Sequence, residues 1–64
     1  MNQYLDIFKD AIIEIDSQGN TIYDKYKMIE IIMDLEKWDE EGSIDYLEYN
    51  IWYSNIFKNV IFLD

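Results

Sequence analysis

The fold is decided by residues 12–24, which read IIEIDSQGNTIYD. Residues 12–16 alternate in character and are rich in β-branched side chains, which is typical of a strand. Residues 17–20 are serine, glutamine, glycine and asparagine, a composition that favours a tight turn. The residues after the turn again favour a strand. We therefore predict a β-hairpin with strands at 12–16 and 20–23.

A helix is expected to follow the hairpin. Asp24 is a suitable N-cap, and nothing interrupts the helical pattern through Lys37. Apolar side chains at helical spacing give this segment one face for a core: Met28, Ile31, Ile32 and Leu35. Charged side chains of mixed sign take the opposite face: Lys27, Glu30, Asp34 and Lys37.

A second helix is expected to begin at Asp39 or Ser43 and to end near Tyr53. Placed at about 100° per residue, its side chains fall into three stripes. The aliphatic stripe is formed by Ile44, Leu47 and Ile51. The acidic stripe is formed by Glu41, Asp45 and Glu48 and ends at Trp52, and the third stripe by Tyr46, Tyr49 and Tyr53.

Two further segments complete the predicted fold. Residues 60–63 are a continuous apolar run that reads as a last strand, whereas residues 54–59 have no assignment. A short first helix is indicated by the spacing of Tyr4, Ile7, Phe8 and Ala11. We predict one small α+β domain over residues 1–64, with a three-stranded antiparallel sheet (the hairpin plus the C-terminal strand) packed by two α-helices.

The composition excludes several classes of function. The 64 residues carry five basic and fourteen acidic side chains, a formal net charge of −9, and no cysteine or histidine. A chain this short buries only about 60% of its unfolded surface, so a deep active-site cleft is not expected. No thiolate or imidazole is present to bind zinc or to attack a substrate. We predict no enzymatic activity and no cofactor.

The charge and the hydropathy also bear on partners and location. Direct binding to nucleic acid or to anionic lipid needs clustered lysine and arginine, which this chain lacks. No apolar stretch approaches the roughly 20 residues of a membrane helix, and no secretion signal is recognised at the N-terminus. The absence of cysteine fits a reducing compartment. We expect a cytoplasmic protein that binds neither nucleic acid nor membrane directly.

The carboxylates offer no convincing metal site. The run from Asp16 to Asn20 faintly resembles a calcium loop, but its glycine is at the fourth position instead of the sixth. Position 12 of such a loop would be Lys27, where a bidentate glutamate is needed. We interpret the run as a hairpin turn and predict no metal site.

The acidic concentration is the strongest functional signal. Residues 34–48 contain seven acidic side chains and one lysine, and this net −6 is two-thirds of the charge of the chain. Such a surface can steer the protein onto a basic partner protein, although it can also serve only to keep the chain soluble. The candidate partner-binding residues, with two tryptophan anchors, are Trp38, Asp39, Glu40, Glu41, Asp45, Glu48 and Trp52.

The aromatic side chains give an alternative. Six tyrosines, two tryptophans and three phenylalanines exceed what so small a core can hide. Some of them can therefore form an interface between two copies of the chain, and the rest can lie in the core with polar tips at the surface. The candidate self-interface of a homodimer is Tyr46, Tyr49 and Tyr53.

Three segments of the chain carry recognisable motifs: residues 23–33, YDKYKMIEIIM, residues 39–50, DEEGSIDYLEYN, and residues 60–64, VIFLD. They are similar to YDYDKMIEILM, SEEEAIEYFEFN and PIFLD, which belong to a family of short proteins of tailed phages and prophages of low-GC Gram-positive bacteria. Residues 11–16 fit the strand that usually precedes these motifs, so the resemblance covers about residues 11–64. The chain departs from the pattern at Gly42, where the family has glutamate, and at residues 51–57, which lack the family's glycines.

The resemblance implies a phage or prophage accessory protein but supplies no activity. Small acidic phage proteins often act by occupying a host protein. The leading hypothesis is therefore an inhibitor or modulator of a host nucleic-acid-handling or defence protein, acting by occlusion and by DNA mimicry. The alternatives are a self-associating interaction module and an antitoxin-like neutraliser of a basic partner.

Overall fold

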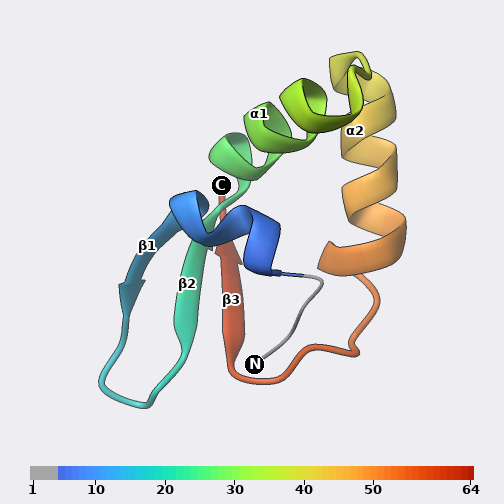
Figure 1. Cartoon of the computed structure of the whole chain (residues 1–64). Helices are drawn as coiled ribbons and strands as arrows, with labels where there is room; N and C mark the ends of the chain where they lie inside the picture. The colour runs from blue at the N-terminus through green and yellow to red at the C-terminus, as the bar shows by residue number, and fades with distance from the viewer. Residues whose placement is uncertain (1–4) are drawn as a thin grey trace.

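The structure is a computed structural model that describes residues 5–64. Its sheet contains β1 (Ile12–Ile15), β2 (Thr21–Asp24) and β3 (Val60–Leu63), with β2 in the middle (Figure 1). β1 and β2 form the predicted antiparallel hairpin, and the last strand begins and ends where the sequence predicts it.

The direction of the last strand differs from the prediction. β3 runs parallel to β2, in register from Thr21 opposite Val60 to Asp24 opposite Leu63, so the sheet is mixed and the expected antiparallel arrangement is wrong at β3. The reason is the route of the chain, because the helices carry it from one end of β2 back to the other end before β3 begins (Figure 1).

Within residues 5–64, four helical segments accompany the sheet. The first is the short 3₁₀-helix η1 (Asp6–Ala11), which occupies part of the predicted N-terminal helix; Tyr4 lies outside the described residues. The α-helices are α1 (Lys25–Glu36) and α2 (Glu40–Leu47), and α2 continues directly into η2 (Glu48–Trp52), one turn of π-helix. The predicted α+β class is thus confirmed.

The ends of α1 follow from its sequence. The carboxylate of Asp24 accepts hydrogen bonds from the backbone N–H groups of Tyr26 at 2.9 Å and Lys27 at 3.3 Å, which confirms the predicted N-cap. Lys37 closes the helix in the left-handed conformation, with φ 61° and ψ 32°. Leu35, predicted to face the core, is 53% exposed, because it lies in the last turn, and the buried positions of α1 are Met28, Ile29 and Ile32.

One hydrophobic core joins η1, α1, α2 and η2 to a single face of the sheet. Its buried members are Leu5, Phe8, Ala11, Tyr23, Met28, Ile29, Ile32, Leu47 and Ile51. In the sheet, Tyr23 and the paired Phe62 lie on this face with their rings 5.7 Å apart. Ile22 is buried but belongs to the opposite face, in one row with Glu14 and Ile61.

Candidate interaction surface

The start of α2 is fixed by Asp39, one of the predicted partner-binding residues. Its Oδ1 accepts a hydrogen bond from the N–H of Gly42 at 2.8 Å, as expected of an N-cap. The buried hydroxyl of Ser43 donates to the Asp39 carbonyl at 2.8 Å, so the helix begins at Asp39 and not at Ser43. The Asp39 carboxylate therefore stabilises the start of α2, whether or not it also contacts a partner.

The aliphatic stripe decides which way the other side chains of α2 and η2 point. Leu47 is fully buried, Ile51 is buried and Ile44 is half-buried against the core. Their burial confirms that the predicted aliphatic stripe faces inward. The acidic residues Asp45 and Glu48 are consequently carried on the outer side of the helix, where Asp45 is exposed and Glu48 half-buried.

The π-turn changes the order of the side chains after Glu48. Its wide hydrogen bond joins the N–H of Tyr53 to the carbonyl of Glu48 at 3.1 Å. Because the bond spans five residues instead of four, each residue advances the chain through a smaller angle than in an α-helix. The side chain of Trp52 therefore points toward the core, and the side chain of Tyr53 lies on the same side of the helix as Asp45 and Glu48.

Trp52 consequently does not end an exposed acidic stripe as the sequence predicts. It is half-buried, and its indole Nε1–H donates to the sulfur of Met28 at 3.5 Å. The ammonium group of Lys25 lies 4.8 Å from the Trp52 ring and 6.0 Å from the Tyr53 ring, and pairs with Asp64 at 3.4 Å. Trp52 therefore packs inward and stabilises η2.

The predicted tyrosine stripe is divided in two. Tyr46 is half-buried and packs against Trp38, with ring centroids 5.2 Å apart. Tyr49 and Tyr53 are 85% and 65% exposed and point to solvent. The three rings therefore do not form one continuous surface, and Trp38, itself 40% exposed, caps the corner between α1 and α2.

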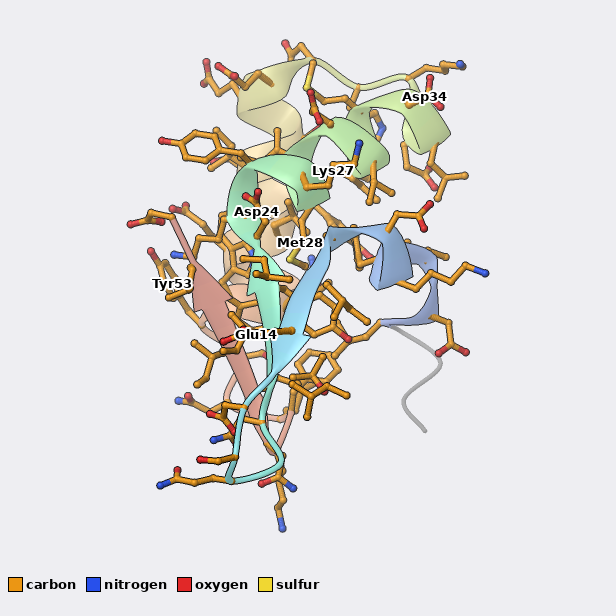
Figure 2. The ribbon with its side chains drawn as sticks, turned by 90° about the vertical axis from the view of Figure 1, so that its left-hand side faces the viewer. Glu14, Asp24, Lys27, Met28, Asp34 and Tyr53 are labelled. Atoms are coloured by element: carbon orange, nitrogen blue, oxygen red, sulfur yellow. The ribbon has the colours of Figure 1, made fainter. Side chains whose placement is uncertain are left out.

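The exposed rings and the outward carboxylates share one surface of the helix. Asp45, Glu48, Tyr49 and Tyr53 line a shallow, open hollow on α2 and η2. We refer to these four residues as the acid–tyrosine face. Figure 2 labels Tyr53, which lies beyond β3 on the side of the molecule away from η1.

The carboxylates of this region are not neutralised by the described lysines. Within residues 5–64, the ion pairs join Lys25 to Asp64, Lys27 to Glu30, and Lys37 to Asp34. None of these pairs involves an acidic residue of 39–48, and the sequence contains no basic residue between Lys37 and Lys58. The carboxylates of the acid–tyrosine face therefore form no ion pair within the described part of the chain, and the nearest lysine is Lys25, which lies at the edge of the face beside Glu48 and Tyr53.

Two titratable groups of the described residues have clearly shifted pKa values. Hydrogen bonds from Asn20 and the turn amides lower the pKa of Asp16, and burial together with Asp6 raises the pKa of Tyr23. Both groups belong to the hairpin. Residues 5–64 contain no group of three or more histidine, cysteine, aspartate or glutamate residues placed to hold a metal ion. In the same part of the chain, no helix has the length and apolar character needed to cross a membrane.

Comparison of the chain with protein-family models, with curated proteins and with solved structures returned no match. The surface is therefore interpreted from its own geometry. Sequence reasoning found Asp45 and Glu48, but it assigned Tyr53 to a different stripe from theirs. Only the π-turn brings Tyr53 beside them, and we find no sequence signal for that turn.

Proposed function

We propose that the chain is a binding protein that docks on a basic surface of a partner protein through the acid–tyrosine face. The observation that supports this is that one hollow combines two exposed phenol rings with two carboxylates that form none of the ion pairs found within residues 5–64. A carboxylate accepts charge-assisted hydrogen bonds from arginine and lysine, and a tyrosine ring attracts the same cations over its face. A basic surface is the chemical complement of this arrangement.

The acidic side chains along the helix extend the proposed contact. Glu41, Asp45 and Glu48 are separated along the axis by roughly 6 and 4.5 Å, from a rise of about 1.5 Å per residue. One strand of DNA carries a phosphate about every 3.4 Å along its axis. Successive phosphates also advance around the duplex, so the distance between them is larger than this rise and comparable to the spacing of the carboxylates. In the proposed mimicry of DNA, Glu41, Asp45 and Glu48 replace a few phosphates. Asp39 and Glu40 form the rim, and Trp38 is the apolar anchor at the far end.

The resemblance to short phage and prophage proteins supplies the proposed biological setting. In that setting the partner is a basic nucleic-acid-handling or defence protein of the bacterial host, and the site of action is the host cytoplasm. Binding would occlude the basic groove that the partner uses for nucleic acid, so the effect on the partner is inhibition. No cofactor or catalytic step is needed for this mechanism.

The first experiment is capture from a lysate of a low-GC Gram-positive bacterium, with elution by salt and mass spectrometry. The test variant is Asp45→Lys with Glu48→Lys, and the matched control is Asp6→Lys with Asp10→Lys, which changes the net charge equally on exposed residues of η1. We expect a basic protein that the wild type and the control retain and the test variant loses. Association of the purified pair should slow at least about tenfold in the test variant.

Two results would count against the proposal. Equal loss of binding in the test and control variants would mean that only the overall charge matters. An affinity that is the same at low and high ionic strength would exclude the electrostatic mechanism, including the mimicry of DNA. The Tyr49→Ala and Tyr53→Ala variants complete the test, because both rings are exposed and their loss should weaken binding without unfolding the chain.

A further inference from the structure

β1 is an open edge of the sheet. Among the described residues 5–64, no element lies beyond it in Figure 1, and in Figure 2, which looks onto this edge, β1 is the strand nearest the viewer. All four of its residues are exposed, although three are isoleucines, with Ile13 at 54% and Ile15 at 67%. An apolar edge strand of this kind is a template for pairing with another strand.

The hairpin geometry identifies the free backbone groups. The N–H of Asp16 donates to the carbonyl of Asn20 at 2.9 Å, so Asp16 is a hydrogen-bonded position of the hairpin. Because such positions alternate along an antiparallel pair, the N–H and C=O of Ile15 point away from β2. An added strand can form hydrogen bonds with both the N–H and the C=O of Ile15, and the bonds within the hairpin remain in place.

The side chains of β1 specify what an added strand should carry. Ile12 and Ile15 share rows with Tyr23 and Thr21 on the face of the sheet that packs on the core. Glu14 shares a row with Ile22 on the opposite face, and Figure 2 shows its side chain directed away from η1. The complementary strand therefore has a cationic side chain opposite Glu14 and apolar neighbours on the core-facing side.

A second copy of the chain is a poor occupant of this edge. In a two-fold antiparallel pairing that uses the regular part of β1, Glu14 faces either the Glu14 or the Asp16 of the other copy. Like charges directly opposite each other destabilise a strand pair. The irregular register between Ile12 and Glu14 prevents a shift of the pairing toward the start of the strand.

We infer that the β1 edge binds an extended segment of a partner protein by β-strand addition, with a lysine or arginine of that segment opposite Glu14. The main-chain bonds at Ile15 hold the segment, and the pair with Glu14 sets its register. This edge and the acid–tyrosine face lie on different sides of the molecule, with β1 at the left and α2 at the right of Figure 1. The inference is therefore independent of the proposed function.

The test uses two synthetic peptides, acetyl-Thr-Val-Lys-Val-Thr-amide and the same peptide with glutamate in place of lysine. Amide NMR spectra of the full chain are recorded during titration with each. We expect the lysine peptide to shift the resonances of β1 and to protect the Ile15 amide from hydrogen exchange, and the glutamate peptide to bind at least about tenfold more weakly. The chain with Glu14→Lys should reverse this preference.

A chain of 64 residues can also be made by chemical synthesis, so a single backbone N–H donor can be removed. N-Methylation of Ile15 should abolish peptide binding, whereas Ile15→Val, which keeps the N–H, should preserve it. The Asn20 and Thr21 resonances report whether the hairpin remains formed in each chain. Equal binding of the two peptides, shifts confined to α2 and η2, or pairing of two copies through β1 would each overturn the inference.

Discussion

The carboxylate of Asp16 accepts three hydrogen bonds within the turn that joins β1 to β2. Oδ1 accepts from the N–H groups of Gln18 at 2.9 Å and Asn20 at 2.8 Å, and Oδ2 accepts from the side-chain amide of Asn20 at 3.2 Å. Gly19 supplies the positive φ of 86° that the turn requires. The ionised carboxylate accepts these bonds more strongly than the protonated acid does, so this one side chain couples the hairpin to pH.

We predict that the pKa of Asp16 lies below its usual value of 3.8 in the folded chain, mainly because of the Asn20 backbone N–H. A lowered pKa in the folded state means that the stabilisation is present above about pH 3.8 and is lost as the pH falls through the lower, folded value. Titration of the carboxyl carbon by NMR measures this pKa. Asn20→Ala removes one of the three bonds and should raise the pKa, and a pKa of 3.8 or above in the native hairpin would contradict the prediction.

The α2 helix shows a conflict between two local preferences. Asp39 caps the helix, and Gly42 lies inside its first turn, where alanine would normally be more stable by about 1 kcal/mol. A Cβ atom at position 42 would lie 3.0 Å from Oδ1 of Asp39, which is the atom that accepts the capping bond. The glycine therefore leaves space for the cap at the cost of helix propensity.

This conflict predicts a non-additive pair of substitutions. Asp39→Ala should lower the free energy of unfolding by about 1 kcal/mol. Gly42→Ala should give little or no gain in the wild-type chain, but about 1 kcal/mol of stabilisation when Asp39 is already alanine. Urea denaturation of the four chains measures the coupling. An equal effect of Gly42→Ala in both backgrounds would show that the side chain of Asp39 moves away freely.

The elements differ in how far their sequence specifies them. Capping residues and apolar spacing correctly predicted the start of α1, the hairpin and the inward stripe of α2, because these features depend on neighbours within a few residues. The direction of β3 depends on the whole route between β2 and β3, which an apolar run such as 60–63 does not encode. The positions of Trp52 and Tyr53 depend on the pitch of one turn, and regular 100° spacing misplaces both.

At the scale of the whole molecule, charge is the dominant feature. The net charge is −9, and each ion pair found within residues 5–64 has at least one exposed partner. Exposed pairs contribute little, so the repulsion between carboxylates is largely uncompensated. The carboxylates of the acid–tyrosine face are then expected to lower the stability of the folded chain.

We therefore predict that salt stabilises the free protein. Raising the salt concentration from about 10 to about 150 mM shortens the screening length from about 30 to about 8 Å and should raise Tm by several degrees. Asp45→Asn with Glu48→Gln should raise Tm at low salt, and the difference should shrink at high salt. Thermal unfolding followed by circular dichroism measures both effects, and a Tm that falls with added salt would be inconsistent with this account.

The parallel pairing of β3 with β2 also determines the order in which the structure can form. The hairpin joins residues close in the chain, whereas the pairing of Thr21 with Val60 closes a long loop that contains both α-helices. Closing a longer loop takes more conformational entropy, so this contact is expected late on the folding pathway. β3 should then be the first strand to open in the native state, exchanging its amide protons faster than β2. Until β3 docks, the side of the central strand β2 that β3 later covers is unpaired, so the partly folded chain exposes backbone groups that the finished molecule covers and is more prone to associate.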